Sequence, residues 1–322
     1  MAGRFPRRDF LAALIAGASL PAWSAPPGRT FRVGFLGIGD ADTFFGGGGR
    51  QILAALAALG YARGRNLELV ECYEKESPEK LFACARKLAA LRVDAIVTEG
   101  TTSTLAARDA TRAIPIVTTV GDPVTAGFAA SLRRPGGNIT GIAQNRAETA
   151  RKQIELLRIM RPRLADIAIL WEPPFPGADI LMRPIVEAAR EASIATHEIT
   201  RESSDLAPTL ARMRSLHLEA AFLVGGLDQS GLDAARAARV AIISPSKDDV
   251  EAGALFAVEP DTSDAPVQLA SILDKVLRGA NPAEMPFQSA TRYLTVINAR
   301  TAEALGIRMT PDLLIRAERI IR

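Results

Sequence analysis

Short apolar runs alternate with longer amphipathic segments along most of the chain. The short runs are rich in Val, Ile and Phe and predict β-strands, whereas the longer segments carry apolar residues at helical spacing. The first pair is a strand at Phe31–Ile38 and a helix at Gln51–Leu59, which ends at Gly60, a residue type typical of helix C-termini. This alternation favours a parallel sheet covered by helices.

Four strands, which alternate with three helices, precede Asp122. Beyond the first pair, strands are expected at Leu67–Tyr73, Ala95–Thr98 and Ile116–Val120, and helices at Pro78–Leu91 and Ser103–Ala113. Ser77 is a suitable N-cap for the helix that begins with Pro78. A turn at Pro135–Asn138 and a short strand at Ile139–Ile142 lead out of this region.

The same alternation then restarts. Strands are expected at Ile167–Trp171, Thr196–Ile199, Ala220–Val224, Ala241–Ile243, Ala254–Val258 and Tyr293–Asn298. Helices are expected at Ala147–Met160, Ile180–Ala192, Asp205–Leu216, Leu232–Ala238, Ala265–Leu277 and Ala299–Leu305, with a polar segment at the end. The repeated pattern predicts an α/β protein made of two doubly wound parallel-sheet lobes.

The first 25 residues have the layout of an export signal. Arg4, Arg7 and Arg8 precede an apolar run at Phe10–Leu20, and small residues follow up to Ala25. The run is shorter than the roughly 20 residues that span a bilayer, so we expect a protein released into the periplasm. The segment from Pro6 to Leu11 resembles a twin-arginine motif, and the alternative is an ordinary secretory signal with adjacent arginines.

Composition agrees with a soluble two-domain protein. The chain has 322 residues, of which 48% are hydrophobic and 23% charged, which is enough to bury a sizeable core. The formal net charge is +3, and the proposed signal contributes +2 of it, so the remaining chain is close to neutral. A nucleic-acid partner is not expected, because binding phosphates requires a basic cluster.

Cysteines and histidines are few. Cys72 and Cys84 are the only cysteines, and they could pair in an oxidising compartment or remain as two buried thiols. His197 and His217 are the only histidines and lack the spacing of a zinc site. We expect neither a metal nor a cofactor.

Candidate binding residues lie where the strands end. In open α/β sheets a ligand lies beyond the carboxyl ends of the strands, next to helix N-termini. The residues at such positions are Thr98, Gly100, Thr101, Thr102, Asp122, Trp171, Glu172, Asp228 and Ser244.

Structural roles are open for the same residues. Thr101 and Thr102 could cap a helix, Asp122 could shape a turn, and Trp171 could lie in the core. Carboxylates that face inward would call for a cationic ligand or arginine partners, because burying an unpaired carboxylate is costly.

Several motifs together resemble a known family. They read LGYARGRN at Leu59–Asn66, VDAIV at Val93–Val97, IPIV at Ile114–Val117, GDPV at Gly121–Val124, LRRPGGNITG at Leu132–Gly141, KVLRGANP at Lys275–Pro282 and VIN at Val296–Asn298. In this order and spacing they resemble the bacterial ABC-transporter substrate-binding proteins that include the tryptophan and tyrosine transport-associated proteins.

The resemblance implies a type I periplasmic-binding fold with two lobes and a hinge of three crossovers. One lobe would comprise residues 31–141 and 260–285, and the other residues 142–259 and 286–322, with crossovers near Gly141, Glu259 and Pro286. The implied function is capture of a small organic ligand, an amino acid or a related compound, by closure of the cleft. The closed monomer would deliver this ligand to an ABC permease in the membrane.

The chain departs from the family at the second crossover, where Glu259 stands in place of the usual aromatic residue. Glu259 therefore joins the candidate ligand-binding residues, and Phe44 and Phe45 in the first loop are the aromatic residues that could stack on an aromatic ligand.

Two other functions remain open from the sequence. A solute-sensing module for a signalling receptor would have the same cleft. An enzyme on the same scaffold is disfavoured, because the sequence lacks a Gly-x-Ser-x-Gly elbow and a dinucleotide fingerprint.

Overall fold

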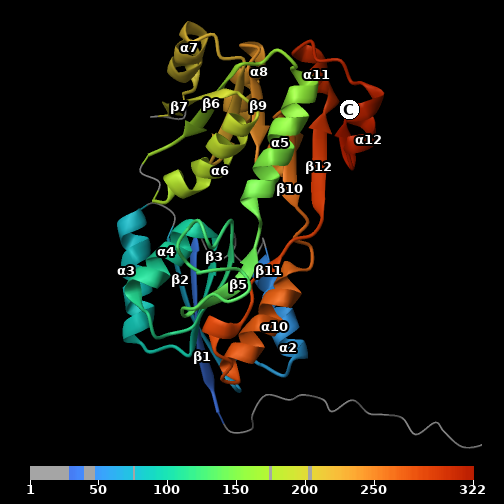
Figure 1. Cartoon of the computed structure of the whole chain (residues 1–322). Helices are drawn as coiled ribbons and strands as arrows, with labels where there is room; N and C mark the ends of the chain where they lie inside the picture. The colour runs from blue at the N-terminus through green and yellow to red at the C-terminus, as the bar shows by residue number, and fades with distance from the viewer. Residues whose placement is uncertain (1–28, 40–47, 75–76, 174–175, 202–204) are drawn as a thin grey trace, which may run out of the picture.

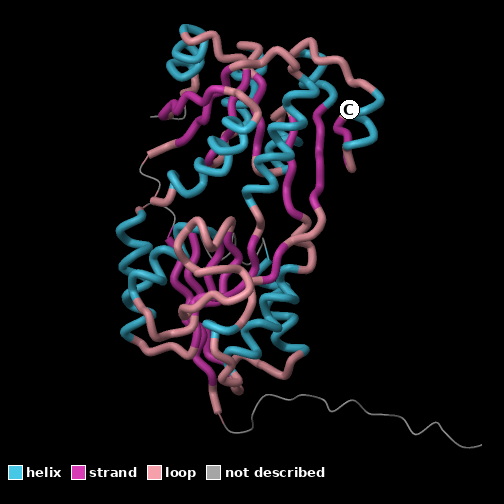
Figure 2. The backbone as a smooth tube through the Cα atoms, in the orientation of Figure 1, coloured by secondary structure: helices cyan, strands magenta, loops and turns pink. Residues whose placement is uncertain are grey.

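The computed structural model describes residues 29–39, 48–74, 77–173, 176–201 and 205–322. The chain forms two α/β lobes, drawn one above the other in Figure 1. Each lobe contains one sheet, and the tube in Figure 2 shows helices packed around the strands of both sheets. The predicted α/β class with two parallel-dominated sheets is confirmed.

The first lobe contains a six-stranded sheet in the order β11-β5-β4-β3-β1-β2, and its described strand pairs are all parallel. Its strands are β1 (Phe31–Ile38), β2 (Leu67–Glu74), β3 (Ala95–Glu99), β4 (Ile116–Val120), β5 (Ile139–Ala143) and β11 (Gln288–Ser289). Its helices are α2 (Arg50–Ala58), α3 (Pro78–Ala90), α4 (Gly100–Ala110), α10 (Ala265–Leu277) and the short 3-10 helix η2 (Pro282–Glu284).

Both faces of this sheet are buried because successive side chains of a strand point to opposite sides. On β1, Phe35 packs with α2 and α10, whereas its neighbour Leu36 packs with α3 and α4. Ser77 caps α3 as predicted, with its hydroxyl accepting a hydrogen bond from the Lys80 amide at 3.3 Å. A disulfide joins Cys72 on β2 to Cys84 on α3, which settles the alternatives left open for the two cysteines.

The second lobe contains a seven-stranded sheet in the order β13-β12-β10-β9-β8-β6-β7, in which only the described β10–β12 pair is antiparallel. Its strands are β6 (Asp166–Trp171), β7 (Ala195–Thr200), β8 (Ala220–Val224), β9 (Ala241–Ser244), β10 (Phe256–Pro260), β12 (Tyr293–Asn298) and β13 (Arg319–Ile321). Its helices are α5 (Arg146–Met160), α6 (Ala178–Glu191), α7 (Ala207–Ser215), α8 (Gln229–Ala237), α9 (Lys247–Ala252), α11 (Ala299–Ala304) and α12 (Pro311–Arg316).

The core of the second lobe also has two layers. Buried residues of α5, α6, α11 and α12 pack on one face of the sheet, and those of α7, α8 and α9 pack on the other. On β8, Phe222 points to the layer of α5 and α6, and its neighbour Leu223 points to the layer of α7, α8 and α9. Because these strands are buried on both faces, they are continuous apolar runs in the sequence.

The described chain passes between the two sheets three times, between β5 and α5, between β10 and α10, and between β11 and β12. β5 continues to Ala143 in the first sheet, and β11 pairs with it through Gln288 and Ile142. Backbone pairing thus extends the first sheet to Ala143 and Ser289, and the lobe boundaries near Gly141, Glu259 and Pro286 stay a prediction. Within the described residues, none of the helices is both long and apolar enough to cross a membrane.

Candidate functional site

Two cavities lie at the carboxyl ends of the two sheets, where this fold places a ligand. The larger, called here the Arg146 cavity, has a volume of about 230 Å³ and lies in the second lobe between α5, α6 and the ends of β8 and β9. The smaller, called the Glu99 cavity, has a volume of about 90 Å³ and lies in the first lobe beside the ends of β3 and β4. A groove of about 560 Å³ beside α5 and α12 is larger, but it is remote from the strand ends.

The hinge segment between β5 and α5 connects the two cavities. Gln144 lines the Glu99 cavity, and Arg146, two residues later, lines the Arg146 cavity. Asn145 between them has a left-handed backbone with φ of 51°, a conformation that Asn tolerates better than most residues. A change in this segment would therefore move the two cavities relative to each other.

Arg146 is the most unusual group at this site. Its Nε atom is buried and has no hydrogen-bond partner, and no carboxylate within the described chain forms an ion pair with its guanidinium. Desolvation lowers the pKa of this guanidinium, although an arginine remains charged at any physiological pH. Arg146 is also the first residue of a 15-residue helix, where the helix dipole disfavours a positive charge.

The stem of Arg146 lies against the first lobe. A Cβ atom added to Gly121, which follows β4, would lie 2.6 Å from Cδ and 2.7 Å from Nε of Arg146. Only glycine leaves room for this approach. The Arg146 cavity therefore lies at the boundary between the lobes, although second-lobe residues line it.

The other polar groups that line the Arg146 cavity are engaged in internal hydrogen bonds. Gln153 donates to the carbonyl of Ser244 at 3.1 Å and to that of Val258 at 3.4 Å. The Ser244 hydroxyl donates to the Asp249 carboxylate and accepts from the Ser246 amide at 3.0 Å. The Thr149 hydroxyl donates to the Asn145 carbonyl at 3.3 Å. These bonds fix the wall of the cavity and leave the Arg146 donors available.

Apolar side chains form the rest of this wall. They include Ala150 on α5, Leu181, Pro184 and Ile185 on α6, and Phe222 on β8. The cavity thus combines an apolar surface with one cationic group.

Glu99 is a second charged group without a partner. It ends β3, lines the Glu99 cavity, and forms no ion pair or hydrogen bond with another described side chain. Its side chain is accessible to solvent, but surrounding protein atoms displace much of the water, and this desolvation raises the pKa of the carboxyl. The two cavities therefore carry unpaired charges of opposite sign.

Two of the residues predicted from strand ends line these cavities. Thr98 lines the Glu99 cavity, and its hydroxyl shares a hydrogen bond of 2.9 Å with the Thr104 hydroxyl. Ser244 lines the Arg146 cavity. Gly100 begins α4 with φ of 80°, a left-handed conformation that favours glycine.

Thr101 and Thr102 form a contact between the lobes. The Thr102 hydroxyl donates to the carbonyl of Pro176, just before α6, at 2.9 Å. A Cβ added to Gly177 would lie 3.3 Å from Cγ2 of Thr101, and Ile180 of α6 packs against the core of the first lobe. The start of α4 and the start of α6 accordingly lie next to each other (Figure 1). In this structure Thr102 binds the other lobe.

Four predicted residues have local structural partners. Asp122 accepts hydrogen bonds from the amides of Val124 and Thr125, which shapes a turn. Trp171 is half-buried beside the apolar cluster around Ile169. Glu172 forms an ion pair of 2.5 Å with Arg201. Asp228 caps α8, and hydrogen bonds from the Gly231 amide and the Ser230 hydroxyl lower the pKa of its carboxyl.

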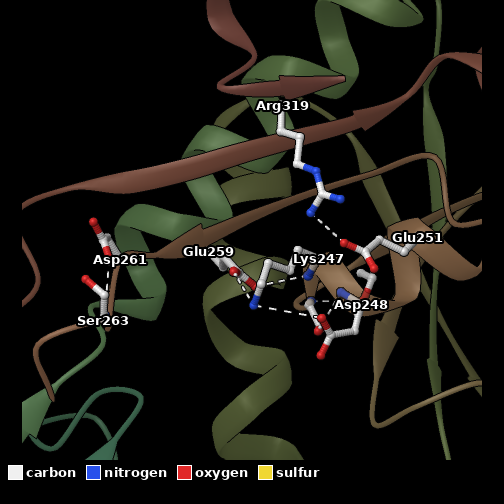
Figure 3. A network of polar contacts seen from close by, with 9 residues as sticks. Lys247, Asp248, Glu251, Glu259, Asp261, Ser263 and Arg319 are labelled. Carbon is white, nitrogen blue, oxygen red and sulfur yellow. Dashed lines mark hydrogen bonds and ion pairs between the residues drawn. The ribbon is translucent and has the colours of Figure 1, made fainter. Parts of the chain in front are cut away.

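Glu259 supports the start of α9, as the close view in Figure 3 shows. It accepts a hydrogen bond from the Lys247 amide at 3.0 Å and lies 3.4 Å from the Lys247 ammonium. The carboxylate thus has the cationic partner that its burial requires. Phe44 and Phe45 lie outside the described residues. The role of these predicted residues in ligand binding stays a prediction.

A pair of α/β lobes joined by three crossings, with cavities at the strand ends, defines a type I periplasmic-binding fold. Residues 48–321 match the family of ABC transporter substrate binding proteins, and the chain belongs to this family. The resemblance seen in the sequence motifs is confirmed.

Relatives within this fold include amino-acid-binding proteins. The tyrosine-binding protein of Clostridioides difficile is 24% identical over 267 residues, which cover 80% of this chain and 76% of the relative. An ABC domain from Streptococcus pneumonia, solved in complex with L-Trp, has a TM-score of 0.76 and 23% identity, covering 91% of this chain and all of that one. A conserved domain protein from Vibrio cholerae has the same TM-score and coverage and 26% identity.

Arg146 and Gln153 were not among the residues predicted from the sequence. The rule of strand ends misses them because both belong to a helix. One signal was present: Arg146 immediately precedes the predicted helix Ala147–Met160, at the end where the helix dipole favours anions.

Proposed function

We propose that this protein is the extracytoplasmic solute-binding component of an ABC importer. It captures a small organic molecule, an amino acid or a related compound, between its lobes and delivers it to a membrane permease without altering it. Membership of the ABC transporter substrate-binding family supports this function. The tyrosine-binding relative and the L-Trp complex of a structural neighbour support the class of ligand.

The observation that carries the proposal is the pair of cavities on either side of the hinge segment Gln144–Arg146. A ligand that contacts both lobes stabilises the closed arrangement, because only there are both sets of contacts made. Rotation at three short crossings is enough to open and close the cleft. Capture of this kind requires no catalytic group.

The proposed location is the periplasm. The N-terminal sequence pattern supports export, although it lies outside the described residues. The disulfide between Cys72 and Cys84 supports the same location, because such bonds persist in oxidising compartments and are rare in the cytosol.

A thermal-shift screen tests the proposed function. The mature protein is melted in the presence of amino acids, carboxylates, polyamines and nucleosides at millimolar concentration. A compound that binds only the folded state at about a hundred times its Kd should raise the melting temperature by roughly 5 °C. Calorimetric titration then measures the affinity of each hit.

Transport is tested in cells. Deleting the gene should abolish uptake of the compound that shifts the melting temperature, and restoring the gene should restore uptake. If no compound in the panel raises the melting temperature, or if a hit is converted to a product, the proposed function is wrong.

A further inference from the structure

We infer that the captured solute is a carboxylic acid with an apolar body, and that Arg146 recognises its carboxylate at the mouth of the Arg146 cavity. This inference rests on the proposed function and names the class of solute. It assigns Arg146 a role in specificity.

Arg146 occupies an unfavourable position within the protein. Its Nε atom is buried without a partner, and it begins a helix whose dipole repels a cation. The Cδ of its stem also occupies space that only Gly121 leaves open. Features that cost stability without a local compensation are concentrated at functional sites, and an anionic ligand would supply the missing compensation here.

Arg146 also offers hydrogen-bond donors to a ligand. A guanidinium carries five N–H donors in a planar fork that matches the two oxygens of a carboxylate. The other polar groups of the wall, on Gln153, Thr149 and Ser244, already have partners within the protein. An entering carboxylate therefore finds its charged donors on Arg146.

The carboxylates nearest to the Arg146 cavity compete little for its positive charge. Asp249 lies behind Ser244, and burial raises the pKa of its carboxyl, which disfavours its negative form. Glu259 is paired with Lys247, and Glu148 lies next to Arg151 and Lys152. With these carboxylates occupied, the Arg146 cavity attracts anions and disfavours ammonium groups, and the unpaired Glu99 lies in the separate cavity of the first lobe.

The size of the Arg146 cavity limits the apolar part of the ligand. The cavity has a volume of about 230 Å³ and a wall that includes Leu181, Ile185 and Phe222. An apolar cavity of about 150 Å³ accepts benzene, so this one accommodates a branched aliphatic or ring-sized group. The combination selects a carboxylate attached to a compact apolar body.

Matched compounds test the carboxylate and the ammonium group of an amino acid separately. Binding of L-phenylalanine, 3-phenylpropionate and phenethylamine, and of L-leucine, 4-methylpentanoate and isoamylamine, is measured by calorimetry on the mature protein. In at least one of these two sets, the phenyl set or the branched aliphatic set, we expect the amino acid or the simple acid to bind. We expect neither amine to bind. If an amine binds as tightly as the matching acid, the inference fails while the proposed function stands. If none of the six compounds binds, the inferred class of solute is wrong. The proposed function is then tested separately by the wider panel of the thermal-shift screen.

Variants then identify the residue. Arg146→Met should weaken binding of the acid by roughly 10- to 100-fold, since it removes a charge-assisted hydrogen bond. Arg151→Met on the same helix is the matched control, because Arg151 lies on the exposed side with Glu148 and Glu191, and it should bind normally. Retained binding in Arg146→Met would overturn the assignment.

A second pair of variants tests the position of Arg146 without removing it. Gly121→Ala places a methyl group against Cδ of Arg146 and should weaken binding of the acid severalfold, whereas Gly137→Ala meets no atom within 4 Å and should have no effect. Without ligand, Arg146→Met should melt at or above the wild-type temperature, because replacing an unpaired buried charge by an apolar group is neutral or stabilising. Melting well below wild type would make Arg146 a structural residue and contradict the inference.

Discussion

At the scale of single residues, the informative groups are those whose charge is left without a partner. Most charged side chains predicted for the cleft have one, as Glu172 has Arg201 and Glu259 has Lys247. Glu99 does not, and desolvation raises the pKa of its carboxyl. The folded chain thus holds a proton on Glu99 more tightly than the unfolded chain does, so this group lowers stability when it is ionised.

We therefore expect Glu99→Gln to stabilise the protein by an amount that depends on pH. As the pH rises from the usual carboxyl pKa of 4.5 through the raised folded-state value, the wild-type protein loses stability that the glutamine variant keeps. The melting temperature of the variant should exceed that of wild type at pH 7, and the difference should shrink below pH 4.5. An equal difference at both pH values would show that ionisation of Glu99 is not responsible. Glu198→Gln, on the exposed face of β7, is the control.

At the scale of elements, one glycine is essential for the pairing of β4 with β5. Gly141 lies opposite Thr118 in the register of these strands, has φ of 151°, and a Cβ there would lie 1.8 Å from the Thr118 carbonyl oxygen. This explains physically why the LRRPGGNITG motif ends in glycine. β5 leads directly into the hinge, so its pairing also positions Arg146.

Gly141→Ala should therefore destabilise the protein by about 3 kcal/mol or more, because the methyl group must displace a backbone carbonyl. Gly137→Ala, in the same motif but in open space, should change stability by less than about 0.5 kcal/mol. Urea unfolding followed by circular dichroism measures both. A Gly141→Ala protein as stable as wild type would refute the close approach.

At the scale of the whole molecule, the lobes touch away from the hinge, where the Thr102 hydroxyl meets the Pro176 carbonyl and Ile180 packs on the first lobe. Thr102→Val keeps the shape of the side chain and removes this hydrogen bond, a loss of about 1 kcal/mol. We expect the ligand-free variant to populate more open forms, with a larger radius of gyration in solution X-ray scattering. Ser215→Ala, whose hydroxyl bonds only within its own helical turn, should scatter like wild type, and an unchanged Thr102→Val would show that this bond does not hold the lobes together.

Local pattern was sufficient for much of the architecture. Most strands and most helices follow from apolar spacing, because a buried strand and an amphipathic helix each show their burial in neighbouring residues. The Ser77 cap could be predicted for the same reason. The short elements α9, η2, α12, β11 and β13 were not predicted, because each has few buried residues; α12, for example, buries only Leu313.

The sequence by itself determined the two-lobed α/β plan and the family, and it predicted binding residues at the strand ends. The tertiary structure decided which charges stay unpaired, since Glu172 and Arg201, or Lys247 and Glu259, meet only across strands. It also decided that Cys72 pairs with Cys84, that Thr102 reaches the other lobe, and that Arg146 lies against Gly121. The physical reason is that local periodicity records whether a residue is buried, whereas the partner of a buried charge is chosen by segments that are distant along the chain and adjacent only after folding.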